Sequence, residues 1–266
     1  MAAPRSTCVS RRLGTAEMKT AVRALLIRLP AALQAALYKV RFAAQHPKLF
    51  PALRDYTYTD EHLKFVHILE CMNYVRVAGA TGSIPQVFFE FGCHSGRTFS
   101  AAVRAARFLK MEKAEFYAFD SFRGLPSTKA EEDGIFQAGS FATSRSDFLR
   151  IVKSQSGVRL EDDHVIEGFY AHSLTSQLQS RMPKAGAVHI DVDLYSSTVE
   201  VLEFIKPLIV VGTVLLFDDW YCFAPDARRG EMRAVKEFRE ANPSFAVREW
   251  KAYSTFGQSF FVTALP

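Results

Sequence analysis

The stretch VFFEFGCHSG, residues 87–96, decides the fold class because a short apolar run leads directly into a glycine-containing turn. The run at 87–91 is rich in β-forming residues and is typical of a buried strand. Gly92 permits a tight turn, and Gly96 permits a close approach of a ligand or of a helix start. The alanine-rich segment 98–109 follows and predicts a closely packed helix. This strand–turn–helix unit indicates an α/β protein.

Strand and helix signals alternate along the chain that follows. Predicted strands lie at 115–119, 164–166, 187–194 and 213–217, and predicted helices at 146–153, 198–205 and 230–242. Such alternation is typical of βαβ units and predicts a mostly parallel sheet. Two last strands, at 245–250 and 258–264, are joined by a short glycine-containing segment, which predicts an antiparallel hairpin.

A further helix is predicted before the first strand, over 62–77. The helical spacing places one apolar face on it, formed by Leu63, Val66, Leu69, Met72 and Val75. Glycines and a proline then end this helix before the first strand begins.

Composition excludes several classes of protein. The 266 residues are 48% hydrophobic and 23% charged, which excludes a disordered chain, and four cysteines are too few for a disulfide-stapled miniprotein. The net charge of +5 is uneven, because residues 1–54 hold ten Lys/Arg and a single acid. Residues 55–266 hold 23 Lys/Arg and 27 acids, so the body is slightly acidic. We therefore expect no nucleic-acid partner.

The basic N-terminal segment has two readings. An Arg-rich and Ala-rich segment with almost no acid resembles an organelle transit peptide, but we favour amphipathic helices packed on the body. We assign residues 1–55 to a basic helical extension or lid and 56–266 to the α/β domain. Met18 is a second candidate start, which makes residues 1–17 a candidate disordered extension.

The chain also lacks the usual membrane and metal-knuckle signals. The longest uncharged run in the C-terminal half, residues 207–217, is far shorter than the roughly 20 residues that span a bilayer, so we expect no transmembrane segment. The four cysteines form no CxxC pair, which argues against a zinc knuckle or a redox motif. Dispersed cysteines of this kind indicate free thiols and a cytoplasmic protein.

Three strand ends carry residues that could do chemistry, since ligands of open α/β sheets bind beyond the carboxyl ends of the strands. The first is residues 90–96, which includes Glu90, Gly92, Ser95 and Gly96. It lacks the third glycine of a GxGxxG motif, so a pyrophosphate loop is less favoured and an ordinary strand–helix turn remains the alternative.

Asp120 ends the second predicted strand and is followed by the loop SFRGLP, residues 121–126. An acid at this place can accept hydrogen bonds from ribose hydroxyls. It lies 30 residues beyond Glu90, however, which is farther than the usual spacing of about 20. A solvated turn or a cap is the alternative reading of Asp120.

The third feature is a pair of acidic strand ends. The segment HIDVDLY, residues 189–195, alternates strictly, which predicts that His189, Asp191 and Asp193 share one face of a strand. Asp218 and Asp219 follow the next strand. Carboxylates packed after apolar strands are costly unless they are paired or bind a cation, and together they suit Mg²⁺. Helix capping is the alternative, but it explains one Asp per strand rather than pairs.

Three histidines are candidate site residues: His94 for contact with the cofactor or the acceptor, and His172 and His189 as proton acceptors. His94 lies in the glycine loop, His172 follows the third strand, and His189 faces the same side as Asp191. An exposed position for His94, and hydrogen-bonded structural roles for the other two, are the favoured alternatives.

Taken in order, the motifs EFGCHSG, YAFDSFRGLP, HIDVDLYSST and GTVLLFDDW, followed by RRGEMRAVKEF, resemble the macrocin O-methyltransferase family. The resemblance covers roughly residues 60–265, and the DSFRGLP and DVDLYSST…DDW motifs are its specific parts. It implies a class I S-adenosylmethionine-dependent enzyme that methylates hydroxyls of natural-product sugars. It also implies a doubly wound, Rossmann-like sheet of seven strands, of which the last is antiparallel.

The resemblance also implies a site. Its cofactor-binding residues would be Glu90, Gly92, Ser95, Gly96, Asp120, Ser121 and Gly168. Asp191, Asp218 and Asp219 would bind Mg²⁺, and Asp191 would also take the hydroxyl proton. The chain departs from the family at Trp220, where the family often has tyrosine, and the N-terminal 50 residues match poorly.

Other functions remain open at this point. A catechol or phenol is the main alternative acceptor, because three carboxylates and a metal also suit vicinal hydroxyls. The DxD at Asp191 and Asp193 is compatible with a glycosyltransferase, whereas the missing GxGxxG argues against a nicotinamide dehydrogenase. A non-enzymatic binding module would leave the carboxylates unused. We expect a small hydroxylated acceptor as partner, and a homo-oligomer is compatible with the sequence.

Overall fold

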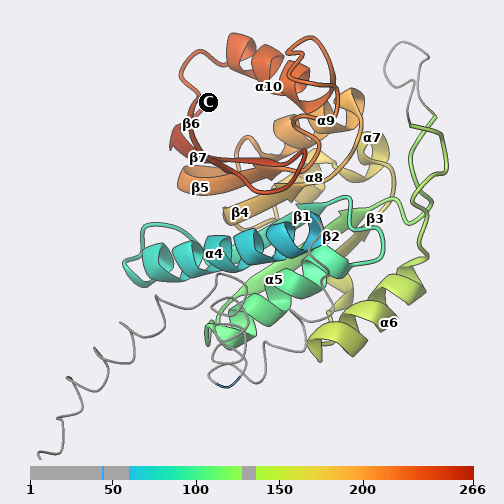
Figure 1. Cartoon of the computed structure of the whole chain (residues 1–266), viewed down its shortest axis with the longest axis vertical. Helices are drawn as coiled ribbons and strands as arrows, with labels where there is room; N and C mark the ends of the chain where they lie inside the picture. The colour runs from blue at the N-terminus through green and yellow to red at the C-terminus, as the bar shows by residue number, and fades with distance from the viewer. Residues whose placement is uncertain (1–43, 45–59, 128–135) are drawn as a thin grey trace, which may run out of the picture. The chain divides into compact units, whose positions relative to one another are not determined.

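The computed structural model describes residues 44, 60–127 and 136–266. The predicted N-terminal helices, the extension over residues 1–17 and the boundary at residue 55 lie outside the described residues. A seven-stranded sheet forms the centre of the described part (Figure 1), in the order β3-β2-β1-β4-β5-β7-β6.

The strands are short, as in most α/β domains. They are β1 (Val87–Phe91), β2 (Glu115–Asp120), β3 (Val165–Glu167), β4 (Ala185–Ile190), β5 (Ile209–Phe217), β6 (Ala246–Ala252) and β7 (Gln258–Ala264). The helices are α4 (Asp60–Ala80), α5 (Arg97–Phe108), α6 (Arg145–Ser156), α7 (Tyr170–Ser173), α8 (Ser176–Gln179), α9 (Tyr195–Ile205) and α10 (Gly230–Ala241), with one 3₁₀ turn, η1 (Asp162–His164).

The strand order confirms the predicted doubly wound sheet. β1, β2, β3, β4 and β5 pair in parallel, and β7 pairs antiparallel with both β5 and β6. The chain builds outward from β1 to β3 and then returns to place β4 on the other side of β1. Such a reversal opens a crevice at the carboxyl ends of the two central strands, which is where ligands of this architecture bind.

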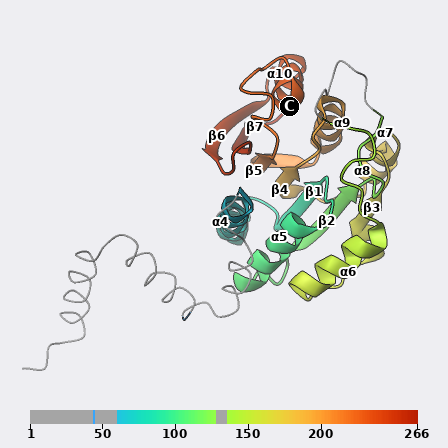
Figure 2. The same ribbon diagram turned by 45° about the vertical axis from the view of Figure 1, so that its right-hand side comes forward.

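Two layers of helices cover the sheet (Figure 2). Helix α5 packs between α4 and α6 on one face, while α9 packs against α7, α8 and α10 on the other. Both faces of the central strands are therefore buried, which explains why β1 reads as a continuous apolar run rather than an alternating one.

The exception in β1 is Glu90, which is 1% exposed. Phe89 and Phe91 belong to the core beneath α9, where both contact Phe119. Phe88 points to the other face and contacts Phe99 of α5. Because side chains alternate along a strand, Glu90 shares the face of Phe88. A carboxyl group has thus been placed where an apolar side chain would stabilise the fold, which points to a role outside packing.

One predicted strand is too long. β4 ends at Ile190 instead of residue 194, so the prediction that His189, Asp191 and Asp193 share one face of the strand is wrong, because both acids follow the strand. Asp193 has a φ of 60°, a left-handed conformation that turns the chain out of the sheet. The alternation of apolar and polar residues continues past the end of β4 because Val192 and Leu194, although they lie in the following loop, are buried.

The helix predicted over 62–77 is present as α4, and its predicted apolar face is only partly the buried one. Met72 and Val75 of that face are buried, but Leu63 is 55% exposed. Phe65 and Ile68, which lie outside the predicted face, are buried. The helix carries apolar residues on most of its circumference, so periodicity alone did not determine which stripe faces the protein.

Two smaller expectations can be compared with the structure. Cys71, Cys93 and Cys222 carry free thiols, as the dispersed cysteines indicated. Among the helices of the described ranges, none combines the length and apolarity that crossing a bilayer requires.

Candidate functional site

A cavity of about 700 Å³ lies at the carboxyl ends of the central strands. A volume of this size is ordinary for a small-molecule site. Its lining includes most of the residues that the sequence singled out, namely Glu90, Gly92, Ser95, Asp120, Ser121, Gly168, Asp191, Asp193, Asp218 and Asp219. The sheet therefore brings together residues spread over 130 positions of the chain.

Position 92 requires a glycine because the backbone of the neighbouring loop leaves no room for a side chain. The φ of Gly92 is 80°, and a Cβ at this position would lie 1.6 Å from the carbonyl oxygen of Asp191. The Asp191 amide donates to the carbonyl of Phe91 at 2.9 Å, so the loops after β1 and β4 touch. Gly92 thereby allows the glycine loop to lie directly beside the first acid.

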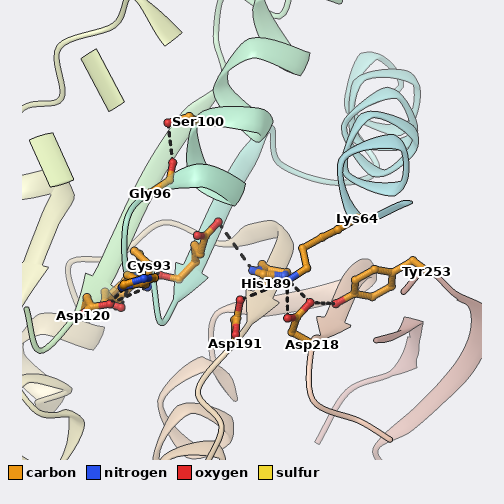
Figure 3. A network of polar contacts seen from close by, with 12 residues as sticks. Lys64, Cys93, Gly96, Ser100, Asp120, His189, Asp191, Asp218 and Tyr253 are labelled. Carbon is orange, nitrogen blue, oxygen red and sulfur yellow. Dashed lines mark hydrogen bonds and ion pairs between the residues drawn. The ribbon is translucent and has the colours of Figure 1, made fainter. Parts of the chain in front are cut away.

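Gly96 has a packing role and, unlike the other predicted cofactor residues, does not line the cavity. It precedes α5 with a φ of 72°, and a Cβ here would lie 2.9 Å from the side chains of Phe148 and Val152 in α6. Its carbonyl accepts a hydrogen bond from the Ser100 hydroxyl at 2.6 Å (Figure 3). Gly96 thus fixes the start of the helix rather than facing a ligand.

Asp120 organises the glycine loop (Figure 3). Its Oδ2 accepts from the amides of Cys93 at 2.7 Å and His94 at 2.9 Å, and its Oδ1 accepts from the amide of Phe122 at 2.7 Å. Burial raises the pKa of Asp120, and the three amides oppose that rise. A carboxylate has roughly four acceptor positions, so about one remains for a ligand hydroxyl.

Gly168 closes the cavity on the other side of Asp120. Its amide donates to the Asp120 carbonyl at 3.0 Å, and its φ is 133°. The following Phe169 and Tyr170 also line the cavity. The Tyr170 hydroxyl donates to the carbonyl of Phe119 at 3.1 Å, which holds this ring against the end of β2.

The two acidic strand ends meet around a lysine that sequence reasoning missed. The Nζ atom of Lys64, from α4, lies 2.5 Å from Asp218 Oδ2 and 3.7 Å from Asp191 Oδ2 (Figure 3). The hydroxyl of Tyr253 donates to Asp218 Oδ1 at 3.3 Å. Neither residue belongs to a motif, because a single lysine in a helix or tyrosine after a strand carries no spacing signal.

Charge and burial shift the pKa values of Asp191, Asp218 and Lys64 in different directions. Burial and the charge of Asp218 raise the pKa of Asp191 well above its ordinary value. Burial also acts to raise the pKa of Asp218, but His189 and Lys64 outweigh it and hold that pKa below the ordinary value. Burial acts to lower the pKa of Lys64, yet Asp191 and Asp218 raise it, so Lys64 is a cation here.

Asp219 lies beside this pair rather than within it. Its Oδ2 accepts from the Asp193 amide at 3.1 Å, and its own amide donates to Glu231 Oε2 at 3.0 Å. Burial and the charge of Asp193 raise the pKa of Asp219. Glu231, from the first turn of α10, is 1% exposed and was also missed, because one acid at a helix start resembles ordinary capping.

His189 lies between Glu90 and Asp218. Its Nδ1 is 3.8 Å from Glu90 Oε2, and its Nε2 is 3.7 Å from Asp218 Oδ1. Among the residues described, neither ring nitrogen of His189 forms a hydrogen bond, and the same holds for Glu90 Oε2. Burial lowers the pKa of His189 and raises that of Glu90. A buried polar row therefore runs from β1 through β4 to the end of β5.

The other two candidate histidines, His94 and His172, lie outside this polar row. His94 lines the cavity, and its Nδ1 lies 2.7 Å from the Phe141 carbonyl and 2.9 Å from the Thr143 hydroxyl. His172 is exposed in α7 and is not part of the cavity lining.

The acids suit a divalent cation. Asp191, Asp218 and His189 each offer one ligand atom, and these atoms lie within 4.8 Å of one another. Carboxylate oxygens are the preferred ligands of Mg²⁺, and two carboxylates so close together need positive charge, which Lys64 supplies in this structure and a divalent ion would supply when bound. The donor set therefore fits the ion, with Asp219 beside it in the same cavity.

Comparisons with known proteins agree with this arrangement. The family model of macrocin O-methyltransferase (TylF) matches residues 48–246. The solved O-methyltransferase NovP is 19% identical, with 76% of this chain and 80% of that chain covered and a TM-score of 0.62. The calicheamicin methyltransferase CalS11 is 17% identical, with 98% of each chain covered and a TM-score of 0.59. No curated protein matches.

The two solved structures support the fold, and the family model covers well over half of the chain. The chain belongs to the macrocin O-methyltransferase family of S-adenosylmethionine-dependent O-methyltransferases.

Proposed function

We propose that this protein is an S-adenosylmethionine- and Mg²⁺-dependent O-methyltransferase that methylates a hydroxyl of a sugar or a natural-product glycoside. One observation carries the proposal. A single cavity is lined both by the glycine loop that Asp120 organises and by the carboxylates of Asp191 and Asp218. The first half suits a nucleoside cofactor, and the second suits a cation and an acceptor hydroxyl.

In the cofactor half, several residues that line the cavity would contact S-adenosylmethionine. When bound, S-adenosylmethionine supplies an activated methyl group on a sulfonium ion. Asp120 has about one acceptor position left for a ribose hydroxyl. Phe169 and Tyr170 flank the cavity beyond Gly168, where flat aromatic surfaces suit an adenine ring. Gly92 lies against Asp191 and Glu90 beside His189, so the methionine end of the cofactor would lie on this side of the cavity, whose lining also includes Ser95.

In the acceptor half, Asp191, Asp218 and Asp219 would hold Mg²⁺, which supplies positive charge that favours the deprotonated hydroxyl. Asp191 is the residue that we assign to accept the hydroxyl proton. Its side chain is 28% exposed, lines the cavity and follows the backbone that contacts Gly92. Fixing the hydroxyl beside the methyl donor is the larger part of catalysis in such a reaction.

The choice of acceptor rests on the family and its neighbours. The matched family is named for the methylation of macrocin, and one neighbour is described as a TDP-rhamnose 3′-O-methyltransferase. Glycosyl transfer through a DxD is disfavoured, because Asp193 leaves the strand and its amide binds Asp219 instead. The free thiols of the described cysteines support a cytoplasmic enzyme.

The proposal is tested with Asp191→Asn and Asp218→Asn. Each variant should bind S-adenosylmethionine within a few-fold of the wild type in titration calorimetry, because Asp120 and the glycine loop are unchanged. Each should lose methyl transfer to a panel of nucleotide sugars and glycosides by roughly a thousandfold, a magnitude common for removal of charge stabilisation.

The matched control is Asp226→Asn, which removes the charge of a partly exposed acid that pairs with Arg228 outside the cavity. It should leave transfer unchanged. Normal turnover by both site variants, together with full activity in EDTA, would show that the metal assignment is wrong.

A further inference from the structure

Lys64 is placed where a divalent cation would have to bind. Its ammonium group contacts Asp218 Oδ2 at 2.5 Å and lies 3.7 Å from Asp191 Oδ2, and its side chain is 21% exposed. These are oxygens of the same two carboxylates that form the close cluster with His189. The internal cation and a metal ion would therefore draw on the same two carboxylates.

Simultaneous occupation is unfavourable for two reasons. Lys64 Nζ lies between the two carboxylates, so a metal held by both of them would have to take over the negative charge that now pairs with the ammonium group. An ammonium ion within a few ångströms of a divalent cation is also strongly repelled in a half-buried site.

The side chain can leave without moving its helix. Phe65 and Ile68, which flank the same turn of α4, are 1% and 0% exposed and anchor that turn in the core. Lys64 has a flexible four-carbon stem, and it lines the cavity beside Phe65, so its ammonium group has space to swing into.

We propose that Lys64 is an internal counter-ion that competes with the divalent cation for Asp191 and Asp218, so that metal binding requires Lys64 to withdraw. This inference rests on the proposed function, because it assumes that these carboxylates are the metal site. It adds that the affinity for metal is set partly by a helix residue outside every motif.

The test is direct metal binding, without turnover. Mn²⁺ serves as the probe and is followed by electron paramagnetic resonance and titration calorimetry on the full chain. Lys64→Met should bind Mn²⁺ at least roughly tenfold more tightly than the wild type, because a charge-assisted hydrogen bond no longer has to break. Lys64→Arg keeps the positive charge and should bind no more tightly than the wild type.

Lys251→Met is the matched control, since Lys251 pairs with Glu70 of the same helix. It should leave the Mn²⁺ affinity within twofold of the wild type. Lys64→Gln is a polar second variant in case the methionine variant does not fold, and circular dichroism of each variant checks the fold. Asp218→Asn should abolish the binding, which locates the ion.

The outcomes separate the two proposals. Unchanged or weaker Mn²⁺ binding by both Lys64→Met and Lys64→Gln, with normal binding by the wild type, would overturn the competition and leave the metal site standing. Failure of the wild type and of both variants to bind Mn²⁺ would overturn the metal part of the proposed function, and the competition with it.

Discussion

At the scale of single residues, Gly92 shows how closely the two halves of the site are joined. Gly92→Ala would force a Cβ to within 1.6 Å of the Asp191 carbonyl oxygen, and the backbone cannot yield without separating β1 from β4. We expect this variant to lose at least about 4 kcal/mol of stability or to fail to fold, as severe steric changes do.

Gly82→Ala is the control for backbone strain. The φ of Gly82, 74°, is close to that of Gly92, but a Cβ at position 82 would meet no described atom within 4 Å. This variant should lose only about 1 kcal/mol, the cost of the left-handed conformation. Denaturant unfolding of both proteins measures the difference, and equal losses would contradict the close approach at Gly92.

His67 predicts a pH dependence of stability. It is 1% exposed, its Nε2 lies 2.9 Å from the Ser259 hydroxyl, and its ring stacks on Tyr253. Burial lowers its pKa to about 4. The unfolded chain therefore binds a proton more readily than the folded one, and the stability that His67 contributes is full above about pH 6.5 and falls toward pH 4.

His67→Gln removes that titration. The free energy of unfolding of the wild type, relative to the variant, should fall by roughly 2–3 kcal/mol between pH 7.5 and 4.5. Urea unfolding of both proteins at the two pH values gives the comparison. A difference that does not change with pH would show that His67 titrates normally in the folded protein.

At the scale of elements, the loop after β1 depends on an acid at the end of β2. Asp120→Ala removes the acceptor of the Cys93, His94 and Phe122 amides. We expect the Kd for S-adenosylmethionine to rise roughly tenfold to a hundredfold, because hydrogen bonds to a charged group are lost. Amide hydrogen exchange at Cys93 and His94 should become faster.

Asp147→Ala is the corresponding control, because Asp147 is exposed in the first turn of α6 and pairs with Arg150. Its removal should alter neither the cofactor affinity nor the exchange of the glycine loop. An Asp120→Ala protein that binds the cofactor normally would refute the role of β2 in shaping this loop.

Local sequence predicted most elements, and the failures have specific causes. β7 begins and ends where the sequence predicted it, because a glycine-containing segment precedes it and most of its side chains are buried. β4 was extended too far, since Val192 and Leu194 are buried from a loop. The buried face of α4 was assigned correctly at Met72 and Val75 but not at Leu63, since that helix is apolar on most sides.

The site was predictable where its residues follow strands. The four acids lie at the ends of β4 and β5 because parallel neighbours end at the same edge of a sheet. Lys64 was not predictable, because it is 154 residues from Asp218 and only the packing of α4 brings it there. The same holds for Glu231, which reaches the acids from α10 through the Asp219 amide.

At the scale of the whole molecule, the cofactor should stabilise the fold. A ligand that binds only the folded chain raises the free energy of unfolding by about 2.7 kcal/mol at a hundredfold excess over its Kd. S-adenosylhomocysteine should therefore raise the thermal midpoint of the wild type in a calorimetric scan. The same concentration should have a clearly smaller effect on Asp120→Ala, and an equal effect would place the cofactor elsewhere.

The central claim is that one cavity carries methyl transfer from S-adenosylmethionine to a hydroxyl beside Asp191. The most direct test incubates the enzyme with trideuteromethyl-labelled S-adenosylmethionine, Mg²⁺ and a panel of nucleotide sugars, glycosides and catechols, followed by mass spectrometry. We predict a product that carries one labelled methyl group on a sugar hydroxyl, formed by the wild type and absent with Asp191→Asn. Labelled product formed equally by both proteins, or no labelled product while the cofactor binds in calorimetry, would contradict the account.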